Sequence, residues 1–344
     1  MELCKVEHRR PLPLICVGLP YSLDFTTDRV KMDDWMPILN SLTLDRSLKS
    51  INIRSRFQCR KPLEEINSEE KARAIGGKAP VVLTRYILEW LSHSVSQCVK
   101  NSTSLTVLEL EGIPFPGDCL AVLCVGLANT RSLQHLSLQR CYIGDSGCEL
   151  ICRTIADVHS IRSLNLSFCE LTFKCGAALA AALSKQKLLL YHDAWKESLR
   201  YREPDLEAMP GLRRLTLNDN PRLGDTAMLE LIESVRDSLW LKALDLQRCG
   251  LTNNIGNELI DLLDHNNTLV VLDIRQNGSL NEDFVKEVVR RLNENDAEGK
   301  SEYRWLGVSQ KDQRTYATIL YTEDLQERQK PVNDSSMPNT LRRQ

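Results

Sequence analysis

Apolar residues recur along the chain in one pattern, LxxLxLxx(N/C)x(L/I), whose first part alternates like a strand. The copies begin, in chain order, at Leu48, Leu105, Leu133, Ile161, Leu212, Leu241 and Leu269. The first two copies are degenerate; the others carry cysteine or asparagine at the fourth place of the pattern. Most starting positions are 28 or 29 residues apart, as from 105 to 133 and from 212 to 241. A period in this range is typical of one strand plus one helix per repeat.

Such a unit cannot bury its apolar face alone, whereas stacked units share one continuous core. The pattern therefore predicts an α/β fold, a leucine-rich-repeat solenoid of the ribonuclease-inhibitor-like horseshoe type, with strands on the concave side and helices on the convex side. The cysteine or asparagine at the fourth place should turn inward and satisfy backbone groups. A capping residue should begin each helix shortly after the strand. The expected caps are Asp145, Thr172, Asp225, Thr252 and Asn281.

Two longer steps interrupt the period, one from 48 to 105 and one from 161 to 212. We interpret the extra residues as insertions near 58–79 and near 186–210. The first insertion is polar, and we expect it to be a surface excursion that leads into a helix over about 80–99. The second is dense in Trp, Tyr, Arg and Asp.

The remaining residues suggest how the solenoid ends. We expect residues 1–47 to form an N-terminal segment with a helical cap, because apolar residues between 30 and 44 have helical spacing. The solenoid itself should cover residues 48–306. Residues 307–344 should form a C-terminal tail that is disordered from about residue 324, where the chain becomes polar.

Composition and charge narrow the function classes. The net charge is -2 over 344 residues and the sequence pI is near 6.3, which predicts no general attraction to nucleic acid or to an anionic membrane. No window is apolar enough for a membrane helix. The apolar stretch over 11–19 is short and interrupted by proline, so a cytoplasmic chain is favoured over a secreted one.

The sequence carries no recognisable catalytic or metal-binding motif. It contains no phosphate loop, no HExxH and no GxSxG. The twelve cysteines are scattered without zinc-site spacing, which indicates reduced thiols. Cys148 and Cys152 have the spacing of a ligand pair, but we expect them to pack in a helix core. We predict no enzymatic activity, no cofactor and no metal.

Candidate binding residues come from the predicted concave surface. Successive repeats place a mixed set of polar and aromatic residues there, which suits a protein partner better than nucleic acid. A merely solvated inner face is the alternative. One column between the apolar strand positions includes Asp245 and Asp273. The candidate contacts are His135, Arg140, Phe168, Arg214, Asp219 and Arg248.

The insertion near 186–210 supplies a second group of candidates. We predict that it is a partner-docking element with Trp195 and Tyr201 as apolar anchors and with Arg200 and Arg202 as polar contacts, because these residue types dominate interface energetics. The alternative is that Trp195 folds back over apolar surface that the interrupted repeat leaves uncovered.

Several segments resemble the centrosomal protein of 78 kDa family of leucine-rich-repeat centrosomal and ciliary proteins. The most specific are DAWKESLRYREPDL at 193–206 and GLRRLTLN at 211–218. Supporting segments are LWLKALDLQ at 239–247, NTLVVLDIR at 267–275 and KSEYRW at 300–305. The likeness covers roughly residues 11–306.

The resemblance implies a non-enzymatic scaffold at the centrosome, the centriole and the ciliary basal body. Its implied roles are in cilium assembly and centriole biogenesis, through ubiquitin-dependent turnover of centrosomal proteins. The implied partners are centrosomal proteins and a ubiquitin-ligase substrate receptor. Two other classes build on similar repeats, namely a Ran-type GTPase-activating protein and an inhibitor or receptor fragment. The mixed charge of residues 324–344 disfavours the first of these.

Overall fold

The structure, a computed structural model of the 344-residue chain, describes residues 13–57, 59–75, 79–199, 205, 209–296 and 301–306. The chain divides into the units Met1–Arg304 and Trp305–Gln344. All described helices and strands lie in the first unit.

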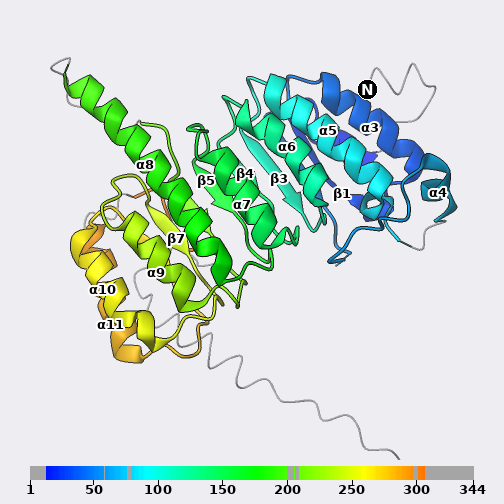
Figure 1. Cartoon of the computed structure of the whole chain (residues 1–344). Coiled ribbons are helices and arrows are strands. Elements are labelled where there is room, and N and C mark those ends of the chain that lie inside the picture. Colours follow the sequence, from blue (N-terminus) through cyan, green and yellow to red (C-terminus); the bar gives the residue numbers. More distant parts are fainter. Residues whose placement is uncertain are drawn as a thin grey trace, which may run out of the picture. The chain divides into compact units, whose positions relative to one another are not determined.

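The described residues of this unit form one parallel sheet of eight strands, which follow each other in sequence order (Figure 1). The middle apolar residues of the repeats lie opposite one another, so that Leu136 pairs with Leu164 and Leu164 pairs with Leu215. The strands are β1 Ser22–Thr26, β2 Ser50–Arg54, β3 Val107–Glu111, β4 His135–Ser137, β5 Ser163–Asn165, β6 Arg214–Thr216, β7 Ala243–Asp245 and β8 Val271–Asp273.

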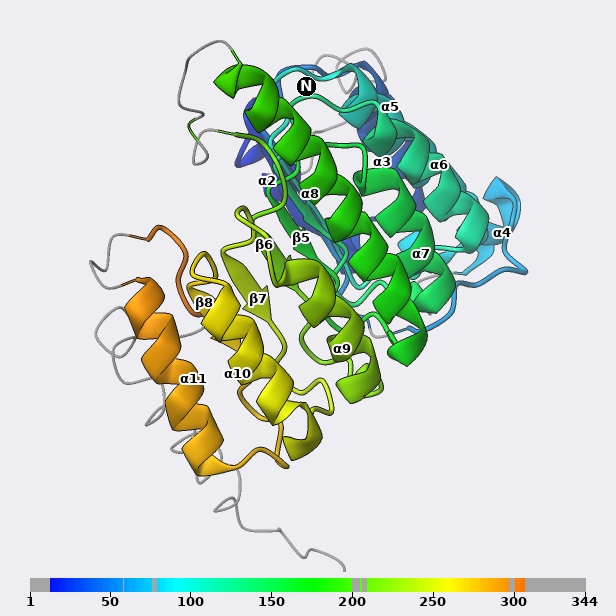
Figure 2. The same cartoon turned by 60° about the vertical axis from the view of Figure 1, so that its left-hand side comes forward.

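Helices connect successive strands and cover one face of the sheet (Figures 1 and 2). The longer helices are α3 Met32–Leu44, α5 Arg85–Asn101, α6 Gly117–Ala128, α7 Gly144–Ile155, α8 Gly176–Ser198, α9 Gly224–Val235, α10 Gly256–His265 and α11 Glu282–Asn295. The short ones are α2 Pro13–Cys16, α4 Glu69–Ala74 and the 3-10 helices η1 Thr27–Arg29, η2 Val81–Leu83, η3 Phe173–Cys175 and η4 Asn253–Ile255. This arrangement confirms the predicted leucine-rich-repeat solenoid. We call the face of the sheet opposite the helices the concave face.

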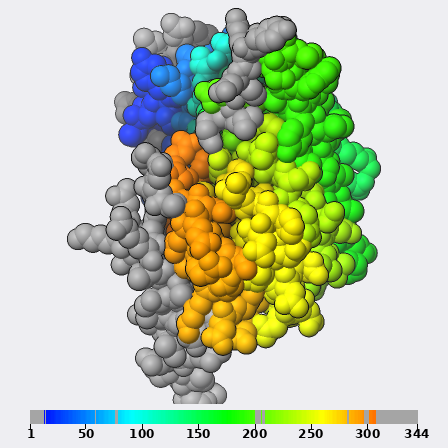
Figure 3. Space-filling model, turned by 90° about the vertical axis from the view of Figure 1, so that its left-hand side faces the viewer, coloured from blue at the N-terminus to red at the C-terminus, as the bar shows by residue number. Residues whose placement is uncertain are grey.

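The core lies between the sheet and the helix layer. The apolar strand residues Leu136, Leu164 and Leu244 are buried, and so is Leu166. Neighbouring helices pack side by side, and Figure 3 shows this for α10 in yellow and α11 in orange. Each repeat therefore relies on its neighbours to bury its apolar surface.

The fourth place of the repeat holds the chain where it leaves each strand, as predicted. The buried thiol of Cys141 donates to the carbonyl of Leu110 at 2.9 Å, one repeat earlier. Asn220, at the same place of its repeat, both donates and accepts. Its amide donates to the carbonyl of Leu166 at 3.0 Å, and its oxygen accepts from the backbone N–H of Cys169 at 3.1 Å. These side chains replace hydrogen bonds that a buried turn would otherwise leave unmade.

Three of the predicted caps are confirmed. Thr172 and Thr252 cap η3 and η4, and Asn281 caps α11; each side chain accepts from a backbone N–H two residues later. The prediction for Asp145 and Asp225 was wrong. Their helices begin one residue earlier, so both lie in the first helical turn.

Asp145 and Asp225 instead join neighbouring repeats. The carboxylate of Asp145 accepts from the backbone N–H of Thr172 at 2.7 Å and from its hydroxyl at 2.6 Å. Asp225 accepts from the same two groups of Thr252. Gly144, which precedes Asp145, has a φ of +62°, a conformation that favours glycine.

The sheet begins one strand earlier than the repeat pattern predicted. In β1, Leu23 and Phe25 alternate with polar residues and point into the core, opposite Ile51 and Ile53 of β2. The strand lies in the segment 1–47, for which we predicted only a helical cap. That helix exists as α3.

The insertions take two different forms. The described part of the first contains α4. The helix expected from about residue 80 begins later, because η2 occupies Val81–Leu83 and α5 begins at Arg85 with Thr84 as its cap. The second continues the helix of its repeat, so that α8 has 23 residues, whereas α7 and α9 have 12 each. The predicted tail over 307–344 lies outside the described residues.

Candidate functional site

A row of side chains follows the strands along one edge of the concave face, and it includes four predicted contacts. The row, which we call the edge row, consists of Gly112, Arg140, Phe168, Asp219, Arg248 and Gln276. Every member has a positive φ, between 52° and 68°. The backbone N–H of Arg140 donates to the carbonyl of Ser167 at 2.9 Å, and that of Asp219 donates to the carbonyl of Gln247 at 2.8 Å. The main chain is thus fixed between repeats.

Neighbouring members of the edge row contact one another. The guanidinium of Arg140 lies over the ring of Phe168, 5.0 Å from its centroid, and is 3.4 Å from the carboxylate of Glu111. Arg248 forms an ion pair with Asp219 in the same row. These partly exposed pairs offer an aromatic ring and charged groups of both signs to a binding partner.

His135, the predicted contact on β4, lies on the concave face and is exposed. Partial burial of its ring lowers its pKa, and the nearby Arg162 lowers it further, whereas Glu109 acts in the opposite direction. At neutral pH the imidazole is therefore uncharged and can both donate and accept a hydrogen bond.

Arg214 differs from the other candidates because it is committed to bonds within the chain. Its guanidinium donates to both carboxylate oxygens of Asp245, at 2.8 and 2.7 Å, and to the carbonyl of Arg304 at 2.9 Å. Only 13% of its side chain is exposed. Burial raises the pKa of Asp245, and the hydrogen bonds from Arg214 and Thr216 oppose that rise.

The column that we expected to face solvent is buried in the C-terminal repeats. Asp245 is covered by Arg214, and Asp273 is bound by Arg275, whose Nη2 is 2.7 Å from a carboxylate oxygen. The prediction that Asp245 and Asp273 belong to an exposed surface was wrong, because arginines from the same face lie against them.

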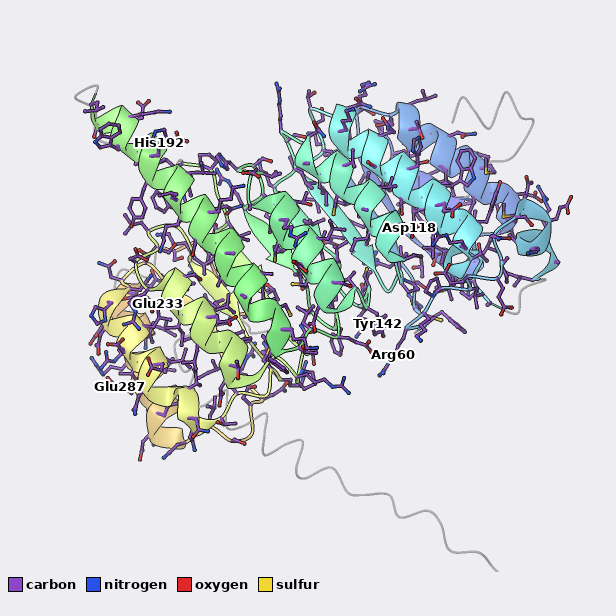
Figure 4. The ribbon with its side chains drawn as sticks, in the orientation of Figure 1. Arg60, Asp118, Tyr142, His192, Glu233 and Glu287 are labelled. Atoms are coloured by element: carbon purple, nitrogen blue, oxygen red, sulfur yellow. The ribbon has the colours of Figure 1, made fainter. Side chains whose placement is uncertain are left out.

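The projecting end of α8 is the second candidate surface. Trp195 is 59% exposed, so it does not fold back over the repeats as the alternative held. The ring of His192 stacks near it, with centroids 6.5 Å apart. Figure 4 shows His192 on the part of α8 that extends beyond the neighbouring helices, away from Glu233 on α9. Arg200, Tyr201 and Arg202 lie outside the described residues.

The predicted anchors did not include Tyr191, which joins α8 to the body of the solenoid. Its hydroxyl donates to the carbonyl of Asp237 at 2.6 Å, and its ring lies nearly perpendicular to that of Trp240, with centroids 4.9 Å apart. The available signal was its position four residues before Trp195, which places both on one face of a helix.

Nine of the eleven cysteines that the structure describes are buried at packing positions. Cys148 and Cys152 are buried, with sulfurs 3.9 Å apart. Burial raises the pKa of Cys169 and of Cys249 to about 12, so these thiols stay protonated at neutral pH. Within the described ranges no cluster of three metal-ligating side chains occurs. The same ranges include no helix of the length and hydrophobicity needed to cross a membrane.

Known proteins are similar to this chain. A family model described as a leucine-rich repeat matches residues 130–152. The human centrosomal protein of 78 kDa is 37% identical over 305 residues, which are 88% of this chain and 44% of that protein. This chain is its homologue, within the leucine-rich-repeat proteins. The Drosophila melanogaster Cep78 homolog is 30% identical over 296 residues, 85% of this chain and 36% of that protein.

The similarity to the centrosomal protein of 78 kDa covers 88% of this chain, but the chain spans less than half the length of these relatives. A pig ribonuclease inhibitor is 27% identical over 192 residues, 54% of this chain and 42% of that protein. This second likeness agrees with the predicted horseshoe type of repeat.

Proposed function

We propose that this chain is a non-enzymatic protein-interaction scaffold of the centrosome, the centriole and the ciliary base. The observation that carries the proposal is the homology over 88% of the chain to a protein named for the centrosome. The proposal extends to support of cilium assembly and centriole biogenesis, through regulation of the ubiquitin-dependent turnover of centrosomal proteins. The partners are centrosomal proteins and a ubiquitin-ligase substrate receptor.

Two surfaces of the solenoid would serve as docking sites. The first comprises His135 and the exposed members of the edge row, where Arg140 and Phe168 stack and Arg248 pairs with Asp219. Arg and aromatic residues contribute most to binding energy at protein interfaces, which supports this choice. We leave Arg214 out, because its bonds to Asp245 and Arg304 hold the fold.

The second surface is the projecting part of α8 around Trp195, together with Arg200, Tyr201 and Arg202 from the following segment. Its support is that Trp195 is exposed together with Leu188 and Leu199 of the same segment, because contiguous exposed apolar side chains mark interaction sites more often than single ones do.

The test is recruitment of the full chain to centrosomes in ciliated cells. We compare the wild type with Arg140→Ala/Phe168→Ala on the edge row and with Trp195→Ala on α8. The control is Leu229→Ala, which changes an exposed apolar residue of α9. Deletion of residues 186–210 is avoided, because Gln186 and Leu190 are buried and the deletion would disturb folding.

We expect the wild type and the control at centrosomes, and reduced recruitment or loss of proximity-labelled centrosomal proteins in at least one of the other variants. A wild-type chain that folds but never concentrates at centrosomes would refute the centrosomal role. Unchanged recruitment and labelling in both variants would refute the assignment of these surfaces.

A further inference from the structure

Exposure falls steeply along one row of residues on the concave face. The first residues of the last five strands lie opposite one another and point away from the helices. We call them the leading row, which consists of His135, Ser163, Arg214, Ala243 and Val271. His135 is exposed, whereas Ala243 is 0% exposed and Val271 is 1% exposed. The helices do not cause this burial, because they cover the opposite face (Figure 1).

The segment that follows the last helix returns to the concave side. It leaves α11 beside β8, because the side-chain amide of Asn295 donates to the carbonyl of Leu269 at 2.8 Å. Further along, the carbonyl of Arg304 accepts from the guanidinium of Arg214 in β6 at 2.9 Å. Between residues 295 and 304 the chain therefore passes from β8 to β6, and β7 lies between these two strands. We call the residues Ser301–Arg304 the C-terminal strap.

The C-terminal strap is bound to the end of α11 as well as to the sheet. The backbone N–H of Ser301 donates to the carboxylate of Asp296 at 3.1 Å, and the hydroxyl of Ser301 accepts from the backbone N–H of Tyr303 at 3.2 Å. The guanidinium of Arg304 is 3.8 Å from the same carboxylate of Asp296. These contacts fix a turn that presents the carbonyl of Arg304 to Arg214, and a hydrogen bond from a charged donor is stronger than a neutral one.

Tyr303 places the middle of the strap near the beginning of β5 and β6. Burial raises the pKa of Tyr303 to about 12 and Glu302 acts in the same direction, whereas the positive charges of Arg213 and Arg162 oppose the rise. Arg162 and Arg213 immediately precede the first residues of these two strands. The partly buried phenol ring therefore lies next to the leading row.

We propose that the C-terminal strap is an autoinhibitory contact that closes the leading row of β6, β7 and β8 to binding partners. The proposal rests on the scaffold function, since it specifies where a docking partner has access. With the strap in place, a partner reaches the concave side at His135 and along the edge row, where Arg248 is exposed. Release of the strap would uncover Ala243 and Val271 and extend that surface. A short segment beside the sheet opens at lower free energy than the strands of the core.

The test measures how fast N-ethylmaleimide alkylates a cysteine introduced into the leading row of the full chain. Val271→Cys places the thiol under the strap, and valine and cysteine are similar in volume, so the packing should be retained. His135→Cys places a thiol on the exposed part of the same row. Peptide mass spectrometry separates the introduced cysteine from the native ones. Each cysteine is compared with itself in different backgrounds, because its own pKa also affects the rate.

Two backgrounds separate release of the strap from general loss of stability. Asp296→Ala/Tyr303→Ala removes the acceptor for Ser301 and the partly buried ring, and so loosens the strap. Tyr21→Ala/Asp283→Ala is the control, because it replaces the same residue types at exposed positions elsewhere.

We expect the loosened strap to speed alkylation of Val271→Cys about tenfold or more, since a buried thiol reacts through local opening. His135→Cys should react rapidly in both backgrounds, and the control should change neither rate. Urea below the unfolding transition should have little effect on the rate at Val271→Cys, because local opening exposes little additional surface. Circular dichroism verifies folding. If Val271→Cys does not fold, Ala243→Cys serves as the buried probe.

Three results would overturn the proposal. One is that the buried probe reacts as fast as His135→Cys in the otherwise unchanged chain, so that the row is not closed. Another is that loosening the strap leaves the rate unchanged, which would mean that another part of the chain covers the row. The third is that the control variant accelerates alkylation as much as the loosened strap does. Centrosomal recruitment is measured separately, so the scaffold function can hold while the strap fails.

Discussion

Replacing Asn220 with alanine removes few atoms, but it should destabilise the middle of the solenoid strongly. Its side-chain oxygen accepts from the backbone N–H of Cys169 at 3.1 Å and of Leu171 at 3.0 Å. Its amide donates to the carbonyls of Leu166 at 3.0 Å and Leu217 at 2.8 Å. Asn220 is completely buried, so water cannot easily replace these bonds.

The size of the effect follows from the groups that the change leaves behind. Asn220→Ala removes the acceptor of two buried N–H groups and a donor to buried carbonyls. Each buried polar group left without a partner costs about 1 to 3 kcal/mol. We expect the free energy of unfolding to fall by about 3 kcal/mol, since part of the structure relaxes around the site.

Urea unfolding followed by circular dichroism measures this change. The matched control is Asn220→Cys, because cysteine holds the equivalent place in other repeats, where Cys249 donates to the carbonyl of Leu217 at 3.2 Å. We expect the cysteine variant to lose clearly less stability than the alanine variant. Equal losses, or an alanine variant as stable as the wild type, would show that these hydrogen bonds do not hold the repeats together.

Three further predictions concern the core, the thiols and the carboxylates. Leu166→Ala should lower the free energy of unfolding by about 2 to 5 kcal/mol through a buried cavity, and a near-neutral result in urea would contradict the observed packing. Reductant with chelator should leave the melting temperature unchanged, because the thiols serve as packing groups; a fall of many degrees would reveal a disulfide or metal. Burial acts to raise the pKa of Asp145, but the hydrogen bonds from Thr172 bring it below 3.8. Its stabilisation is therefore complete above pH 3.8 and is lost as the pH falls further, so Asp145→Asn should be less stable than the wild type at neutral pH and approach it in acid.

The fold could be predicted because its signal repeats. Leucine at alternate strand positions and cysteine or asparagine at the turn recur from repeat to repeat. Each repeat then buries its apolar side chains against the neighbouring repeat. Strand β1 escaped prediction because Leu23 and Phe25 show only a short alternation, which becomes recognisable once β2 lies beside it.

The candidate surfaces were harder to predict, since they depend on contacts between residues far apart in sequence. Periodicity places Asp245 outward, and only the three-dimensional structure shows Arg214 lying against it, 31 residues away in sequence. The roles of Asp145 and Asp225 were misassigned for the same reason, because their partners belong to the next repeat. Trp195 was recognised by its type, but its exposure follows from the length of α8, which the repeat period does not determine.

The edge row separates the part of each repeat that holds the solenoid together from the part that meets the outside. From Gly112 to Arg248 the backbone N–H of each member donates to a carbonyl of the next repeat, while the side chain changes from Gly112 to Arg140 to Phe168 without a change in backbone conformation. Non-glycine residues tolerate this left-handed conformation at a cost of about 1 kcal/mol. Single residues of the edge row can therefore be substituted, by evolution or by design, to alter what the protein recognises while its fold is retained.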